Sequence, residues 1–138
     1  EAMAGKISVY SKTVDESDID ELGHVNNAKY LQFFEQARWD KLAEGGYSLE
    51  EVRKAGESAV VLEVTVRFRR ELLSQEKIRI ESRLVDVKSR IATLEQIIFN
   101  ESGAVSCEAV FKMGFIDLNL RKLISPSPRW LRALGWLE

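Results

Sequence analysis

The sequence has very few residues of the types that form disulfides, metal sites or rigid turns. It contains one cysteine, one histidine and two prolines in 138 residues. Because Cys107 has no partner for an intramolecular disulfide, we expect the protein in the reducing cytosol. One cysteine and one histidine far apart in the chain cannot supply the ligands of a usual structural zinc site. We therefore expect no bound metal.

Long apolar runs and an excess of one charge are also missing. The longest apolar runs fall far short of the roughly 20 residues that span a bilayer, and no secretory signal pattern is visible. The 20 Lys and Arg residues nearly balance the 22 Asp and Glu residues, for a formal net charge of −2. We therefore expect neither a membrane nor a nucleic acid as partner. The basic side chains between Arg67 and Arg79 are predicted to form a solvated sheet face, because no exposed aromatic residues alternate with them.

Glycine-rich phosphate loops are absent as well. The pair Gly45-Gly46 follows a predicted helix rather than a strand, so we expect no nucleotide-binding turn and no organic cofactor. No internal repeat, low-complexity tract or linker divides the chain. The length therefore predicts a single domain over residues 3–138, with the two residues before Met3 as an added extension.

The spacing of apolar residues predicts one long helix early in the chain. They recur at intervals of three and four, which gives one apolar stripe on a helix of about 15 residues. The stripe consists of Tyr30, Leu31, Phe33, Phe34, Ala37 and Leu42. Asn26 or Asn27 is a suitable N-cap, and Gly45-Gly46 ends the helix.

Strands make up most of the rest. A short helix from Ser48 to Gly56, with Glu51 completing a possible capping box, precedes them. The apolar period then becomes two. The predicted strands cover Ile7–Val14 and residues 62–69, 77–84, 91–99 and 105–115. Because hairpin-length connections join the last four, we predict an α+β fold in which a five-stranded antiparallel sheet wraps around the long helix. A short amphipathic tail follows Pro126 and Pro128.

The segment DELGHVNNAKY, residues 20–30, concentrates polar groups just before the long helix. In one interpretation Asp20 is a loop carboxylate, His24 a hydrogen-bonded filler and Asn26 or Asn27 a cap. In the other, the unpaired first amides of the helix, at the positive end of its dipole, hold a developing oxyanion. The turn at Gly23 could then fold Asp20 back over those amides. The residues alone leave both interpretations open.

Thioester hydrolysis is a reaction that needs little more than these groups. A thiolate leaves easily because thiol pKa values lie near ~8.5, so no strong acid is required. A carboxylate that attacks the carbonyl or activates water, together with backbone donors, is sufficient. Cys107 is not expected to act as a nucleophile, because it lies in the middle of a strand on the apolar face.

The same segment resembles a known family. Asp20-x-x-Gly23-His24-Val25-Asn26-Asn27-Ala28-x-Tyr30, followed by Phe34-Glu35-x-Ala37-Arg38-Trp39, is similar to the hotdog-fold thioesterases related to 4-hydroxybenzoyl-CoA thioesterase. The bacterial long-chain acyl-CoA thioesterases are the most similar members. The likeness extends from Ile7 to about Ser125 and implies the hotdog fold and the hydrolysis of acyl-CoA.

The resemblance also implies roles for individual residues. Asp20 takes the position of the catalytic carboxylate, and the amide of Asn27 takes the position that polarises the thioester carbonyl. His24 orients the substrate or binds its carbonyl. Gly23-His24 replaces the glycine and apolar residue typical of aromatic-acyl members, which favours aliphatic acyl groups. Because each buried methylene contributes about 0.8 kcal/mol, we expect medium to long chains. The implied substrate-binding residues are Asn26, Tyr30 and Val61 for the thioester and acyl chain, and Lys88 and Arg90 for the phosphates of CoA.

Several alternatives remain. A second hotdog lineage carries its carboxylate on the central helix, so Glu35 is a second candidate, ranked lower because an ion pair with Arg38 would explain it. The chain could act on acyl carrier protein thioesters, as a hydratase, or as an acyl-CoA-binding module without catalysis. The resemblance further implies a homodimer or homotetramer with active sites at the subunit junction, which unpaired sheet edges also favour.

Overall fold

The computed structural model describes residues 5–136. The ends of the predicted domain 3–138 and the extension before it therefore lie outside the described residues. The chain forms, in order, β1 (Ser8–Thr13), the 3-10 helix η1 (Glu16–Asp18), α1 (Asn27–Glu44), α2 (Leu49–Ala55), β2 (Glu57–Phe68), β3 (Lys77–Lys88), β4 (Ile91–Phe99), β5 (Val105–Asp117), β6 (Lys122–Ile124) and α3 (Pro128–Ala133).

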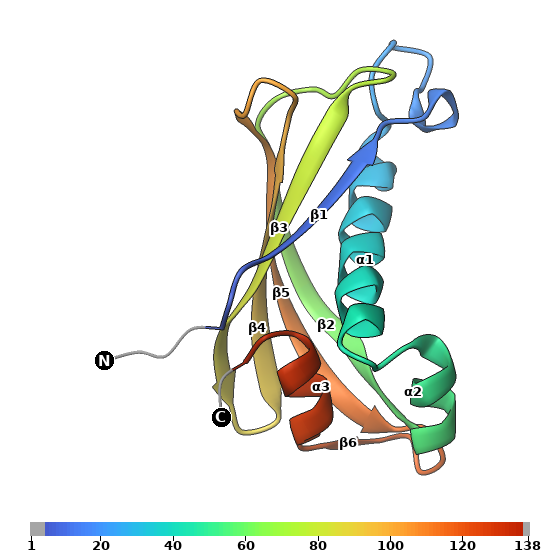
Figure 1. Cartoon of the computed structure of the whole chain (residues 1–138), viewed down its shortest axis with the longest axis vertical. Coiled ribbons are helices and arrows are strands. Elements are labelled where there is room, and N and C mark those ends of the chain that lie inside the picture. Colours follow the sequence, from blue (N-terminus) through green and yellow to red (C-terminus); the bar gives the residue numbers. More distant parts are fainter. Residues whose placement is uncertain (1–4, 137–138) are drawn as a thin grey trace.

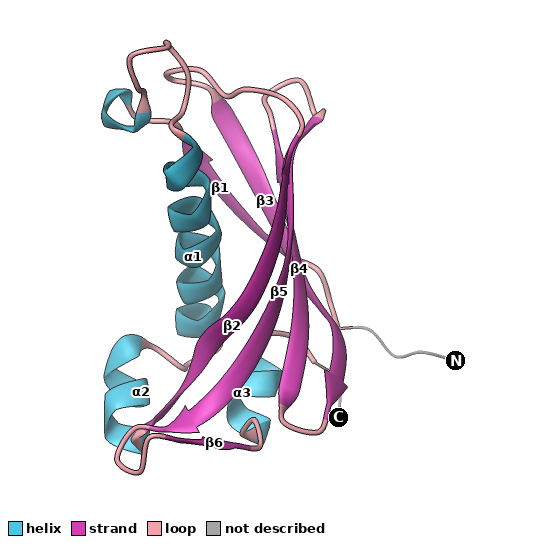
Figure 2. Cartoon of the chain, turned by 180° about the vertical axis from the view of Figure 1, so that it is seen from behind, coloured by secondary structure: helices cyan, strands magenta, loops and turns pink. Residues whose placement is uncertain are grey.

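The main strands form one antiparallel sheet in the order β1-β3-β4-β5-β2. The sheet is strongly twisted, and α1 runs along one of its faces (Figures 1 and 2). Buried side chains from α1 and from the facing side of the strands form a single core. The predicted α+β arrangement, a sheet around a long helix, is confirmed.

The sheet has a sixth, short strand that the apolar pattern does not predict. β6 pairs with the end of β5 through Phe115↔Ile124 and Asp117↔Lys122. The pairing of β5 with β4 ends at Met113, so β6 pairs with β5 beyond that point, on the same side of β5 as β4. Two apolar residues followed by prolines are too short a pattern to identify a strand, and for this reason five strands were predicted.

Helix α1 has 18 residues and begins where the sequence predicted. The side chain of Asn26, the N-cap, accepts a hydrogen bond from the Ala28 N–H, and the helix ends at Gly45. The predicted apolar stripe is buried against the sheet, except for Leu31, which is 43% exposed. The Ser48 side chain caps α2, but no reciprocal bond from Glu51 completes the predicted capping box.

Strand β2 starts five residues earlier than predicted and contains a bulge between Val61 and Glu63. The predicted apolar face of residues 62–68 is therefore incomplete. Val64 and Val66 are half-buried, whereas Leu62 and Phe68 are 49% and 54% exposed. Since β2 is also an edge strand, its outer side lacks a neighbour in the described chain.

Different loops lie at the two ends of the sheet. The loop before α1, the start of α1 and the loop after β2 gather at one end, shown at the top of Figure 1. The β3–β4 hairpin lies at the opposite end.

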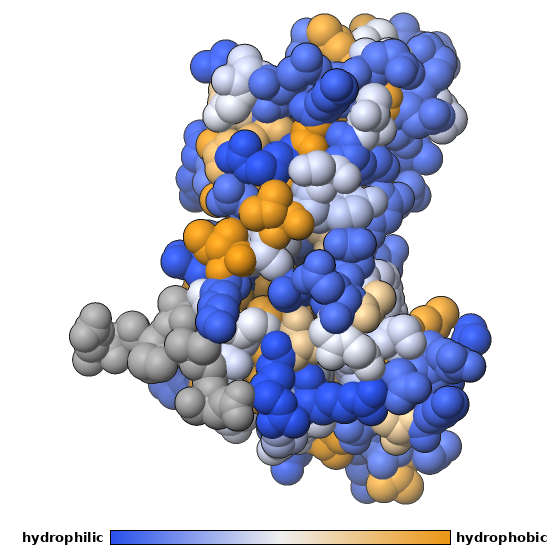
Figure 3. Space-filling model, viewed as in Figure 1, coloured by the Kyte–Doolittle hydropathy of each residue, from blue (hydrophilic) through white to orange (hydrophobic). Residues whose placement is uncertain are grey.

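The face shown in Figure 3 is mostly hydrophilic, with a small hydrophobic group over β1, where Ile7 and Val9 are each 55% exposed. Among the helices of residues 5–136, none has an apolar stretch long enough to cross a membrane.

Candidate active site

The loop between β1 and α1 folds back on itself around Asp20. Ile19 and Val25 form an isolated antiparallel bridge, and the Asp20 N–H donates to the His24 carbonyl oxygen at 2.9 Å. Gly23 has a φ of +86°, which glycine adopts without strain, and its N–H donates to the Asp20 carbonyl oxygen at 3.0 Å. This turn brings His24 back beside Asp20.

The carboxylate of Asp20 is held at one oxygen and loosely bonded at the other. Its Oδ1 accepts a hydrogen bond from the Leu22 N–H at 2.9 Å, whereas the Asn26 Nδ2 donates to Oδ2 at 3.5 Å, the long limit of such a bond. The side chain is 25% exposed. Oδ2 therefore keeps hydrogen-bonding capacity for a substrate or a water molecule.

The first residue of α1 provides a free backbone donor. Asn26 has the extended conformation of an N-cap, and its side chain accepts the Ala28 N–H at 2.9 Å. The N–H of Asn27 has no acceptor among residues 5–136. Because it lies at the positive end of an 18-residue helix dipole, this N–H is suited to bind a negative oxygen.

A cavity of about 480 Å³ brings these groups together. It is lined by Asp20, Leu22, His24, Val25, Asn27, Tyr30, Phe68, Arg69, Arg70 and Glu71. Tyr30 and Phe68 form its aromatic wall, with ring centroids 5.3 Å apart in an edge-to-face arrangement. Burial raises the pKa of Tyr30, so its phenol is neutral at physiological pH.

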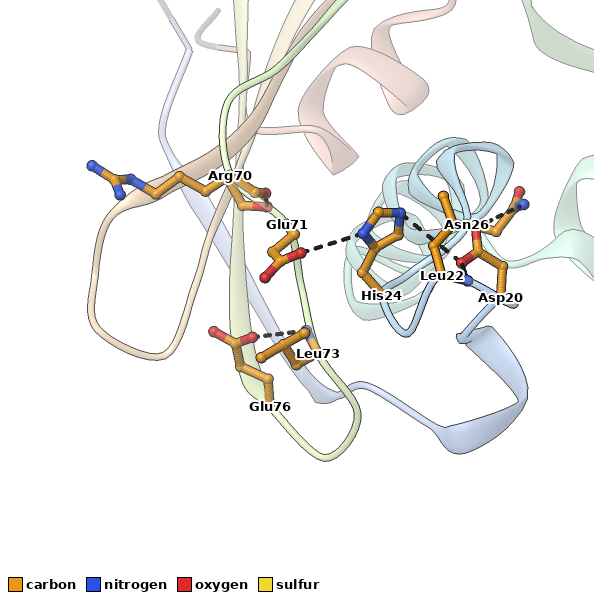
Figure 4. A network of polar contacts seen from close by, with 9 residues as sticks. Asp20, Leu22, His24, Asn26, Arg70, Glu71, Leu73 and Glu76 are labelled. Carbon is orange, nitrogen blue, oxygen red and sulfur yellow. Dashed lines mark hydrogen bonds and ion pairs between the residues drawn. The ribbon is translucent and has the colours of Figure 1, made fainter.

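The imidazole of His24 lies between two carboxylates (Figure 4). Its Nδ1 is 3.3 Å from the Glu71 Oε1, and its Nε2 is 4.0 Å from the Asp20 Oδ1. The His24 side chain is 34% exposed. Among the residues described, no three His, Cys, Asp or Glu side chains are grouped so as to hold a metal ion.

The segment that follows β2 was not predicted to belong to the site. We expected the arginines there to belong to a solvated sheet face, whereas Arg69 and Arg70 line the cavity. Neither Phe68 nor Glu71 was assigned to the site. The segment is separated from His24 by more than 40 residues and shows no periodicity. The contact that brings it there is a backbone hydrogen bond from the Val25 N–H to the Leu72 carbonyl oxygen at 2.9 Å, which no side-chain pattern encodes.

Of the five predicted substrate-binding residues, only Tyr30 lines this cavity, and Asn26 lies next to it through its contact with Asp20. Val61 pairs with Met113 further along β2 and lines a second cavity of about 150 Å³. Lys88 and Arg90 lie at the β3–β4 hairpin, at the opposite end of the sheet from Asp20. The Arg90 Nη1 donates to the Leu123 carbonyl oxygen at 3.3 Å. Within one chain, only Asn26 and Tyr30 of the substrate-binding set lie beside the catalytic candidates.

The predicted ion pair between Glu35 and Arg38 does not form. Arg38 turns into the core, where its Nη1 donates to the Gln96 Oε1 at 3.0 Å and its guanidinium lies 4.5 Å from the centre of the Phe111 ring. Glu35 lines the second cavity and makes no ion pair within residues 5–136. It lies in the third turn of α1, where the backbone N–H groups are used within the helix. Glu35 therefore has no free amide beside it of the kind that Asp20 has.

Cys107 is buried within β5, as its position in the pattern predicted. Burial raises the pKa of its thiol to about 12. At neutral pH the side chain is therefore a protonated, small apolar group, and the thiolate needed for nucleophilic attack is not formed to a useful extent.

Comparison with protein families gives one match over most of the chain. The model of the thioesterase-like superfamily matches residues 14–134. The long-chain acyl-CoA thioesterase FadM of Escherichia coli strain K12 is 32% identical over 108 residues, which are 78% of this chain and 81% of that protein. The chloroplastic acyl-acyl carrier protein thioesterase ATL3 of Arabidopsis thaliana is 28% identical over 86 residues, 62% of this chain and 45% of that protein.

Solved structures agree with this match at the level of the fold. A DHNA-CoA thioesterase from Staphylococcus aureus superposes with a TM-score of 0.82 at 22% identity, over 92% of this chain and 87% of that one. The likeness confirms the predicted hotdog fold.

Proposed function

This chain belongs to the thioesterase-like superfamily, and on that basis we propose that Asp20 and the start of α1 form its reaction centre for acyl-CoA hydrolysis. The activity itself, that of a thioester hydrolase, follows from the family. The observation that carries the assignment of the site is the free N–H of Asn27 in the same cavity as the loosely bonded Oδ2 of Asp20.

The proposed reaction uses these two groups in sequence. The Asn27 N–H donates to the thioester carbonyl oxygen and stabilises the charge that develops on it. Asp20 either attacks the carbonyl carbon, forming an anhydride that water then hydrolyses, or removes a proton from an attacking water. In both routes the carbon–sulfur bond breaks. The CoA thiolate leaves and takes up a proton, while the acid is released as a carboxylate. Water supplies the oxygen and both protons, so no other reactant is needed.

The second cavity supports an aliphatic acyl chain as substrate. It lies along the same helix, between Glu35 and Leu42 of α1 and the first half of β2. The helix rise places Glu35 ~12 Å beyond Asn27, comparable to the extended length of a medium-chain acyl group. Val61 lines this cavity, in keeping with its predicted role beside the acyl chain. Burial of each methylene contributes about 0.8 kcal/mol, so longer chains should be held more tightly.

A thiol-release assay over a series of CoA esters tests this proposal. We expect higher kcat/KM for C10 to C16 acyl-CoA than for acetyl- or benzoyl-CoA. Equal or better values for the two short substrates would reject the aliphatic assignment. Binding of the esters without release of CoA would instead identify a module that binds acyl-CoA and does not hydrolyse it.

The similarity to ATL3 favours acyl carrier protein thioesters as the second candidate substrate. The same Asp20 and Asn27 chemistry would serve, because the two substrates share the phosphopantetheine thioester and differ beyond it. Assays with one acyl group on the two carriers distinguish them. A kcat/KM that is higher for the acyl carrier protein ester would make CoA the secondary carrier.

We propose that the protein is a homodimer joined through β2, or a homotetramer built from two such dimers. This 12-residue strand is an edge of the sheet, and its exposed apolar side chains include Val61 at 45% and Phe68 at 54%. Unpaired edges of this kind favour pairing with another strand. A second copy is also the only source from which Lys88 and Arg90 could reach CoA at Asp20, since within one chain they lie at the far end of the sheet.

The oligomeric state gives a direct prediction. Light scattering should return at least twice the 15.7 kDa mass of one chain at assay concentrations. A charged substitution in the middle of the exposed edge, Val61→Lys, should shift the protein toward monomer. The light-scattering mass is the readout here, because Val61 also lines the proposed acyl-chain cavity. A stable, fully active monomer of the wild-type chain would contradict the proposal.

A further inference from the structure

We infer that Glu71 is a positioning residue that holds the His24 imidazole at the reaction centre through its Nδ1 nitrogen. This inference rests on the function proposed above and extends it to a residue that neither the sequence pattern nor the family resemblance assigns. The contact that carries it is the 3.3 Å separation between the His24 Nδ1 and the Glu71 Oε1.

The backbone fixes these two side chains next to each other. His24 and Glu71 precede Val25 and Leu72, which are joined by a backbone hydrogen bond of 2.9 Å and are 2% and 0% exposed. On its other side the segment is tied to β5, because the Arg70 carbonyl oxygen accepts a bond of 2.7 Å from the Ser106 hydroxyl. The pair of His24 and Glu71 is therefore built on two anchored segments rather than on free loops.

The orientation of Asp20, His24 and Glu71 determines which nitrogen of the imidazole carries the proton. Figure 4 shows Glu71 and Asp20 on opposite sides of the imidazole, whereas the Arg70 side chain points away from them. A carboxylate at Nδ1 can only accept a hydrogen bond, so the proton of a neutral ring stays on Nδ1. The Nε2 then faces Asp20, 4.0 Å from its Oδ1, with its lone pair free.

The exposure of the three side chains increases from Asp20 through His24 to Glu71. The side chains of Asp20, His24 and Glu71 are 25%, 34% and 62% exposed. Hydrolysis at neutral pH releases one proton for each carboxylate formed, and that proton has to leave the cavity. The row from Asp20 through His24 to Glu71 is a route for it to solvent, and the route depends on Glu71 to keep the ring aligned.

A double-mutant cycle on kcat tests the inference. Glu71→Ala should lower kcat by about tenfold, within the range of coupling found between contacting residues, with little change in KM. Glu71→Gln keeps an oxygen that accepts from Nδ1 and should restore most of the loss. In a His24→Ala background, Glu71→Ala should cause no further loss. Glu21→Ala removes a carboxylate from the same exposed loop, outside the cavity lining, and should leave kcat unchanged.

A second readout does not depend on activity. Because His24 is the only histidine, its ring ¹⁵N signals are assigned without ambiguity. They should show the Nδ1–H tautomer in the wild type and a shift toward Nε2–H in Glu71→Ala. An unchanged tautomer, or losses in kcat that add in the double variant, would overturn the role of Glu71. A wild-type protein without thiol release would overturn the proposed function instead, while the tautomer still reports on the contact.

Discussion

Replacing Asn27 by proline should lower kcat by about 10²- to 10³-fold, the loss seen when one oxyanion donor is removed. Proline has no N–H, so the substitution deletes the proposed donor and little else. Asn27 is the first residue of α1, a position where proline is favoured because the N–H has no partner within the helix. The preceding residue, Asn26, has φ −62° and ψ 138°, an extended conformation that is compatible with a following proline.

The matched control is Asn27→Ala, which removes the side chain and keeps the N–H. We expect it to lose far less activity than the proline variant. Circular dichroism and thermal unfolding should show that both variants keep the fold. Equal activity of the alanine and proline variants would mean that the amide of residue 27 does not contact the thioester oxygen.

Asp20→Asn should abolish most activity while the fold and oligomeric state are retained. The amide has nearly the shape of the carboxylate and can still accept the hydrogen bond from the Leu22 N–H at Oδ1. It cannot attack the carbonyl or remove a proton from water. The loss should therefore be on the order of 10²-fold or more in kcat.

The same substitution series distinguishes between the two candidate carboxylates. Glu35→Gln should have the mildest effect, because Glu35 lies in the third turn of α1 without a free backbone donor beside it. His24→Ala should fall between the two, because water can partly replace an orienting side chain. An inactive Glu35→Gln together with a nearly wild-type Asp20→Asn would move the chemistry from the loop to the middle of the helix.

The elements that the sequence predicted well are those in which local chemistry and long-range packing agree. The start of α1 was found because Asn26 is a strong N-cap followed by an apolar stripe, and the cap forms as expected. Strand β4 was predicted over its full length, because its residues are constrained by neighbours on both sides. Strand β2 was predicted less accurately, since a bulge changes its register and one of its edges is open.

The site could be predicted only as far as it is contiguous in the sequence. Asp20, His24 and Asn27 fall within eight residues, and their proximity follows from the turn at Gly23. Glu71 is brought to the site by a backbone hydrogen bond between two segments far apart in the sequence. Such a bond cannot be predicted from the pattern of side chains. The predicted ion pair of Arg38 was wrong for a related reason. Spacing along a helix identifies only possible partners on the same helix. The contacts that Arg38 makes instead are with Gln96 and Phe111, which lie on the sheet.

The most direct test of the account is a crystal structure of the Asp20→Asn variant with an intact acyl-CoA bound. We expect the thioester carbonyl oxygen within hydrogen-bond distance of the Asn27 N–H. We also expect the carbonyl carbon to face residue 20 and the acyl chain to run along α1 toward Glu35 and Val61. A thioester bound beside Glu35, or one whose carbonyl oxygen makes no contact with the amide of Asn27, would contradict it.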